Sequence, residues 1–175
     1  MVIRKLDVGG DMNAVEWISE CAYTIYDDNE RTIQGGASII VCYPRDGLDG
    51  AYQMLKKYST VAAHSLLCVA GSEHSQIRKA SDGHIAEYAF VFIHELFTVN
   101  DDALSCAETI GQFYGYLQRA AWKTRLRYLD VAFFTEVDNE FGESEQNEAW
   151  AEALRGIGFE HADREPNVLF FPVIL

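Results

Sequence analysis

Hydrophobic and polar positions in the C-terminal half of the chain follow a distinct order of elements. A long apolar segment, His84–Val99, leads through a polar break into helical spacing from Ser105 to about Trp122. A strand is expected at Tyr128–Phe134, a helix rich in Ala and Glu at about Glu145–Gly156, and a closing strand at Val168–Leu175. Strands usually span about five or six residues, so the segment from His84 is expected to contain a bend or bulge.

The N-terminal half gives shorter patterns. Apolar residues at helical spacing predict two helices, at 13–26 and 51–62. Alternating or β-branched runs predict strands at 2–8, 38–43, 65–70 and 76–80, with Ser81–Gly83 as a hairpin turn. Strands in succession with intervening helices indicate an α/β (α+β) fold in one domain, 1–175, whose mixed, mostly antiparallel sheet has helices on both faces.

Paired aromatic residues support a sheet that is covered on both sides. Phe133-Phe134 and Phe170-Phe171 are consecutive in predicted strands. Successive strand residues point to opposite faces, so each pair places one ring on either face.

The charge of the chain limits its partners. The formal net charge is −13, which repels phosphate backbones and argues against direct binding of nucleic acid. The same charge favours a small basic amine or a protein with a basic surface, although solubility alone is a sufficient reason for it. No apolar run approaches the ~20 residues of a membrane helix, and the N-terminus lacks a signal-peptide pattern. We therefore expect a cytoplasmic protein that does not enter membranes.

This order of elements resembles the C-terminal half of the GNAT superfamily of acyl-CoA-dependent N-acyltransferases. Asn147 lies eleven residues before Gly158, and Gly158-Phe159 match the glycine-aromatic pair that ends the last helix in that family. The resemblance implies a GNAT-like fold in which the fourth strand bulges and diverges from the fifth. It also implies transfer of an acetyl or acyl group from acetyl-CoA or another acyl-CoA to a primary amine.

The family holds the cofactor pyrophosphate at a glycine-rich segment before a helix, where unpaired N–H groups face the anion. The matching window is Leu104–Thr109, in which Leu, Ala and Thr replace the residues of the family pattern. The resemblance assigns cofactor binding to residues of this region and of the later helix. They are Val99, Ser105, Cys106, Ala107, Glu108, Thr109 and Asn147. Ser105 and Glu108 also form a capping-box pattern, which would use the same N–H groups internally. No metal site is expected.

Catalytic candidates lie on the long strand and on the helix after it. His94 and Glu95 occupy positions where the family often places a base, with Glu87 as a third option, and the alternative is that they simply face solvent. Leu154 stands where the family often has a tyrosine acid, so Tyr114 or Tyr116 is the candidate replacement, with core packing as the alternative.

A second interpretation is a catalytically inactive GNAT-fold module that binds another protein, similar in plan to ornithine decarboxylase antizyme. The capping box, Leu154 and the negative charge favour such an inhibitor or an acidic decoy. We also consider a homodimer in which the apolar C-terminus, Phe170–Leu175, contributes a shared strand.

Overall fold

The structure is a computed structural model. It describes residues 2–6, 18–27, 29, 31–81, 83–99, 103–123, 126–138, 144–146 and 148–174. The elements in chain order are β1 (Val2–Leu6), β2 (Ile18–Tyr26), β3 (Ile33–Cys42), α1 (Gly47–Tyr58), α2 (Thr60–Gly71), α3 (Gln76–Ala80), the 3₁₀ helix η1 (Ile85–Glu87), β4 (Tyr88–Thr98), α4 (Ala103–Lys123), β5 (Tyr128–Phe134), β6 (Glu136–Asp138), β7 (Ser144–Gln146), α5 (Glu148–Gly156), β8 (Glu160–Ala162) and β9 (Glu165–Ile174).

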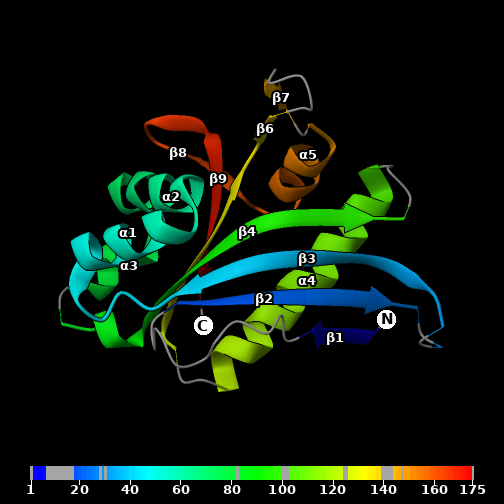
Figure 1. Ribbon diagram of the computed structural model, residues 1–175, viewed down its shortest axis with the longest axis horizontal. Coiled ribbons are helices and arrows are strands. Elements are labelled where there is room, and N and C mark those ends of the chain that lie inside the picture. Colours follow the sequence, from blue (N-terminus) through cyan, green and yellow to red (C-terminus); the bar gives the residue numbers. More distant parts are fainter. Residues whose placement is uncertain are drawn as a thin grey trace.

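The described strands form one large mixed sheet and a small hairpin. The seven-stranded sheet has the order β1-β2-β3-β4-β5-β9-β8, and β6 pairs with β7 outside it. Every neighbouring pair in the large sheet is antiparallel except β4 and β5, which are parallel. Parallel neighbours need a crossover connection, and α4 provides it behind the sheet in the view of Figure 1.

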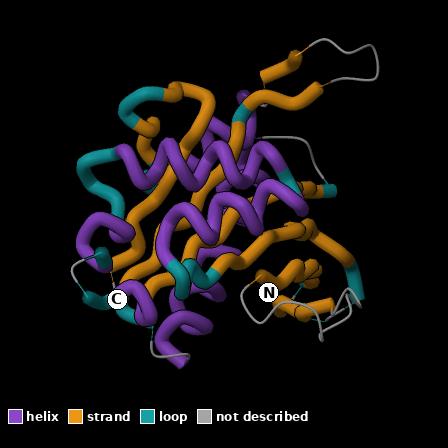
Figure 2. The backbone as a smooth tube through the Cα atoms, turned by 60° about the vertical axis from the view of Figure 1, so that its left-hand side comes forward, coloured by secondary structure: helices purple, strands orange, loops and turns teal. Residues whose placement is uncertain are grey.

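Helices cover both faces of the sheet, as the sequence predicts. On one face, α4 and α5 pack with inward residues of the strands, including Ile39, Val91 and Phe133. On the other face, α1, α2 and α3 pack with Ile40, Phe90 and Phe170 among others. Figure 2 shows α1 and α2 side by side in front of the strands. Within the described residues, no helix has the length and apolar character needed to cross a membrane.

The aromatic pairs behave as predicted. Phe133 belongs to the core under α4 and α5, and Phe134 packs against the core under α1–α3. Phe170 and Phe171 divide between the two cores in the same way. The predicted strand at Tyr128–Phe134 is confirmed at both ends, and β9 confirms a closing strand.

Three predicted elements are wrong in type. Residues 18–26 of the expected helix form strand β2, where the ladders to β1 and β3 override a helix-like spacing of apolar residues. The expected strand at 65–70 lies inside helix α2, because a short apolar run fits a buried helix equally well. The expected edge strand at 76–80 is helix α3, so Ser81–Gly83 does not close a hairpin.

Three predicted boundaries also moved. Helix α4 begins at Ala103 rather than at Ser105, and α5 begins at Glu148. The long apolar segment becomes strand only at Tyr88, because Ile85–Glu87 forms the turn η1.

Candidate functional site: the fork between β4 and β5

The central feature of the sheet is a fork between its two parallel strands. β4 and β5 pair from Tyr88 and Tyr128 up to Ile93 and Phe133. Beyond this point β4 continues to Thr98 with only β3 as a partner, while β5 stays with β9 and leads towards β6. In Figure 1 the green β4 runs to the right, whereas the yellow strand that leads into β6 runs upward. The divergence leaves backbone groups of Glu95–Thr98 without a described strand partner on the β5 side.

A bulge starts the divergence and confirms the expected irregularity in the long strand. Ser38 of β3 pairs with Glu95, and the next residue, Ile39, pairs with Ile93. His94 is therefore an extra residue on β4, and an extra residue bends the strand that carries it. The β4–β5 ladder ends at the residue before this bulge.

His94 and Glu95 share the face that is free of α4. Glu95 pairs with Ser38, which alternates with Ile40 of the α1–α3 core, so these side chains lie on one face. The His94 ring lies 6.5 Å from the ring of Phe92, which belongs to the same core. Both side chains are exposed because α1–α3 cover only the other half of this face (Figure 1). We call the part beyond these helices the open sheet face, formed by Glu20, Ala22, Thr24, Gly36, Ser38, His94, Glu95 and Phe97.

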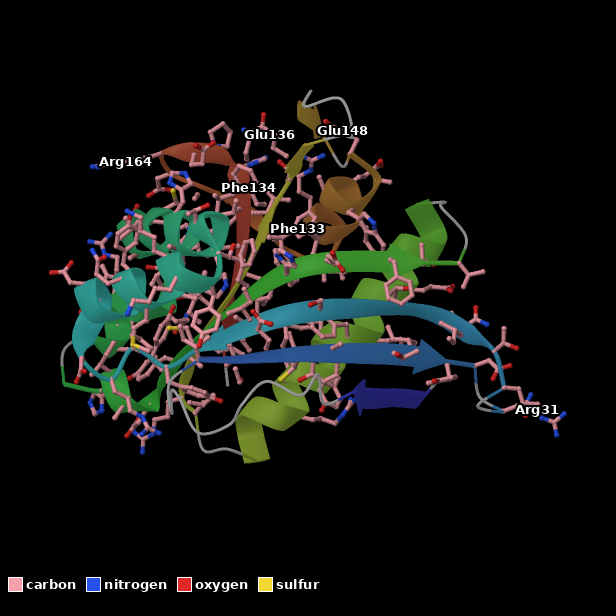
Figure 3. The ribbon with its side chains drawn as sticks, in the orientation of Figure 1. Arg31, Phe133, Phe134, Glu136, Glu148 and Arg164 are labelled. Atoms are coloured by element: carbon pink, nitrogen blue, oxygen red, sulfur yellow. The ribbon has the colours of Figure 1, made fainter. Side chains whose placement is uncertain are left out.

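Acidic side chains flank the fork. Glu95 lies on the β4 arm and Glu136 at the start of the β6 arm, while Glu148 begins α5. In the view of Figure 3, Glu136 and Glu148 are both labelled towards the top, above Phe133 and Phe134. The Asn167 side-chain amide donates to the Glu136 carboxylate at 3.3 Å, and the Glu148 carboxylate pairs with Arg155 of the same helix at 3.7 Å. Glu95 has no such partner among the described residues, so it favours a cation near the β4 arm within a Debye length of about 8 Å.

Two glycines of β3, Gly35 and Gly36, allow side chains of neighbouring elements to pack directly against the backbone of the strand. The Phe97 ring lies over Gly36, where an added Cβ would come within 2.4 Å of it. On the other face Thr109 of α4 approaches Gly35, whose added Cβ would lie 3.0 Å from the threonine side chain. Sequence reasoning treated these glycines as a break before a strand. Only the pairing of Gly36 with Phe97 shows that they serve packing across β3 and β4.

Tyr114 is not brought together with His94 and Glu95. It lies on the α4 and α5 side of the sheet, where its ring makes an edge contact with Phe171, the centroids 4.9 Å apart. The Gln118 side-chain amide donates to the Tyr114 hydroxyl at 3.1 Å. Burial raises the pKa of Tyr114, and the Gln118 hydrogen bond opposes this rise. The hydroxyl therefore stays protonated near neutral pH.

The proposed cofactor residues fall on the first turns of α4 and just before it. Val99 is exposed, and its backbone N–H donates to the Gln34 carbonyl at 3.1 Å. Since α4 begins at Ala103, backbone N–H groups from Ala107 onward are used inside the helix. Glu108 is exposed, and buried Thr109 packs on Gly35. Because α4 begins at Ala103, Ser105 is the third residue of the helix and not its N-cap, so the predicted capping box is wrong. The side chains of Ser105, Cys106 and Ala107, and all of Asn147, lie outside the described residues.

A buried carboxylate that the sequence did not single out lies at the other end of β5. The Asp130 side chain is fully buried and accepts backbone N–H groups of Gln76 and Ile77, at 2.9 and 3.0 Å. The Tyr88 hydroxyl donates to it at 3.0 Å. Burial raises the pKa of Asp130 to about 6, and these three hydrogen bonds oppose the rise. Asp130 lies on β5 and accepts the first backbone N–H groups of helix α3, so it stabilises the start of that helix.

Comparisons with protein-family models, with curated proteins and with solved structures gave no match to this chain. In the part of the chain that the structure describes, no three His, Cys, Asp or Glu side chains gather as a metal site.

Proposed function

We propose that the chain is a GNAT-like N-acyltransferase that transfers an acyl group from an acyl-CoA to a basic primary amine at the β4–β5 fork. The observation that carries this proposal is the end of the β4–β5 ladder at the His94 bulge. Unpaired strand-edge N–H and C=O groups can hydrogen-bond the amides of an extended ligand. The edge of Glu95–Thr98 would hold the cofactor arm with its thioester next to His94 and Glu95.

The chemistry assigned to the open sheet face is deprotonation of the acceptor. His94 or Glu95, directly or through a water, takes a proton from the ammonium group, and the neutral amine attacks the thioester carbonyl carbon. The new N–C bond forms as the C–S bond breaks, the thiolate leaves with its electron pair, and the nitrogen loses its second proton to water to give the neutral amide. The exposed Glu95 carboxylate on the open sheet face favours a cationic acceptor. Tyr114 faces the opposite core, so the proton for the thiolate comes from solvent.

Calorimetric titration with acetyl-CoA and with CoA tests the cofactor. We expect heat of binding at sub-millimolar ligand, with chemical shift changes at the backbone amides of β4 after Ile93. Absence of heat over that range would end the acyltransferase proposal.

Release of free CoA thiol in the presence of polyamines and lysine peptides tests the acceptor and the base. General-base catalysis contributes about 10²–10⁴-fold in rate, so at least one of His94→Ala and Glu95→Gln should lower turnover by about a hundredfold or more. His84→Ala is the matched control, because His84 is also exposed but precedes η1 at the other end of β4. If His94→Ala and Glu95→Gln turn over as fast as His84→Ala, neither His94 nor Glu95 is the base.

A second candidate is a binding module without catalysis. It is favoured by exposed apolar side chains where β3 begins and β4 ends. Ile33, Phe97 and Val99 are 44%, 49% and 62% exposed, and grouped exposed apolar residues often mark protein interfaces. This candidate predicts one stoichiometric, salt-sensitive partner and no binding of acetyl-CoA. Phe97→Glu should abolish retention of that partner. Tyr58→Glu, at an aromatic residue of α1 with 47% exposure, should not.

A further inference from the structure

A second hollow lies away from the fork, among the helices at the N-terminal end of β4. It has a volume of about 360 Å³, near the lower end of the range of about 300–1,000 Å³ for small-molecule sites. Its walls come from α1, α2, α3 and η1, which Figure 2 shows in front of the sheet. Because η1 precedes Tyr88 while the fork begins after Ile93, the two sites are separated by the fully paired half of β4.

The residue types explain both the hollow and its chemistry. Gly47, Ala70 and Ser81 are small and leave the space unfilled. Leu48, Ile77 and Ile85 give it aliphatic walls. The remaining lining residue is Arg78, an exposed side chain of α3 and the one charged group among the described lining residues.

The charge of Arg78 is opposite to that of the whole molecule. The chain carries a net charge of −13, yet the group at this apolar hollow is a guanidinium. Arg78 forms no ion pair with any residue that the structure describes. The Ser81 hydroxyl donates to the Arg78 backbone carbonyl at 2.7 Å, and the guanidinium makes no hydrogen bond to any residue that the structure describes. A planar guanidinium matches a carboxylate with two parallel hydrogen bonds.

We propose that this hollow binds a monocarboxylate with a linear aliphatic chain of medium length, its carboxylate on Arg78 and its chain against Leu48, Ile77 and Ile85. The walls supply the apolar burial, and Arg78 fixes the direction in which the ligand enters. This site does not depend on the acyltransferase proposal, because it shares no residue with the fork.

Titration of the full chain with octanoate, 1-octanol and octylamine, followed by amide chemical shifts, tests this site. We expect octanoate to shift Ala70, Ile77 and Ile85 but not His94, Glu95 or Phe97. Arg78→Gln should weaken octanoate by about tenfold or more, since a hydrogen bond to a charged group is being removed. The same variant should leave octanol unchanged. Lys79→Gln, an exposed cation on the same helix outside the lining, is the matched control.

A second pair of variants tests the hollow without touching charge. Ala70→Phe should fill it and weaken both octanoate and octanol, whereas Val61→Phe, elsewhere on α2, should change neither. The proposal is overturned if octanoate shifts map to the fork, if Arg78→Gln and Lys79→Gln bind octanoate equally, or if octylamine binds as well as octanoate. It is also overturned if octanoate causes no shift at millimolar concentration.

Discussion

The two halves of β4 show how one strand serves two purposes. From Tyr88 to Ile93 every residue is buried; β5 pairs with the whole segment, and β3 pairs with it from Phe90 onward. From His94 to Thr98 every side chain is at least partly exposed, and only β3 remains as a partner. The first half is apolar without interruption, as expected for a strand covered on both faces. The second half carries the polar groups and the free edge on which a ligand site depends.

The comparison separates stability from function along a single strand. The paired half contributes buried area and a full set of ladder hydrogen bonds, so changes there should lower the free energy of unfolding. The open half contributes little burial, so changes there should alter binding more than stability. The following substitutions test that division.

The largest effect is expected from a matched pair of phenylalanines. Phe90→Ala removes a fully buried ring from the paired half and should lower the free energy of unfolding by about 3–5 kcal/mol. Phe97→Ala removes a ring that is half exposed in the open half and should cost less than about 1 kcal/mol. Urea unfolding followed by circular dichroism measures both. Similar costs would mean that the two halves do not differ in stability.

The next effect concerns Asp130, which lies opposite Phe90 in the paired half. Burial raises the pKa of Asp130 to about 6 in the folded state, from 3.8 for a solvated aspartate, so the folded state binds the proton more tightly. Its contribution to stability is complete below about pH 4 and is lost as the pH rises through 6. The difference is on the order of 3 kcal/mol. Asp130→Asn should remove this part of the pH dependence.

Asp130→Asn should also cost about 1–3 kcal/mol at neutral pH, because the amide keeps one acceptor oxygen for three donors. Unfolding measured between pH 4 and 7 for both proteins gives the two quantities. If the free energy of unfolding changes with pH in the same way in the wild type and in the variant, Asp130 is not the source of the pH dependence.

The last effect concerns Gly36 of β3, which pairs with Phe97 in the open half of β4. Gly36→Ala places a Cβ 2.4 Å from the Phe97 ring and 2.6 Å from the Tyr23 carbonyl oxygen. Overpacking of this kind costs about 1–3 kcal/mol, and the Phe97 ring should rotate away from β3. Gly71→Ala is the control, because nothing lies within 4 Å of its added Cβ. A thermal melt and the fluorescence or NMR signals of Phe97 report the outcome, and an unmoved ring would contradict it.

Part of the candidate site was predictable. The length of the apolar segment predicted an irregularity, and the structure places it at His94. The structure places His94 and Glu95 next to the fork, and their catalytic roles stay predictions. Tyr114 shows the limit, since helical spacing puts it on α4 but cannot say which face of the sheet α4 covers. Gly36 shows another limit, because its partner Phe97 is distant in sequence.

The sequence alone predicts the elements whose hydrophobic pattern is long and regular. Strand β5, helix α4 and the division of Phe133 and Phe134 between two faces follow from periodicity alone. Long-range contacts set the type of those elements whose apolar run is short. They also set the elements whose first N–H groups need a hydrogen-bond acceptor from a distant part of the chain. Residues 18–26 became a strand because two neighbours offered backbone partners. Helix α3 exists where Asp130, far along the chain, accepts its first N–H groups. Local propensity amounts to a fraction of a kcal/mol per residue, so such long-range hydrogen bonds and burial outweigh it.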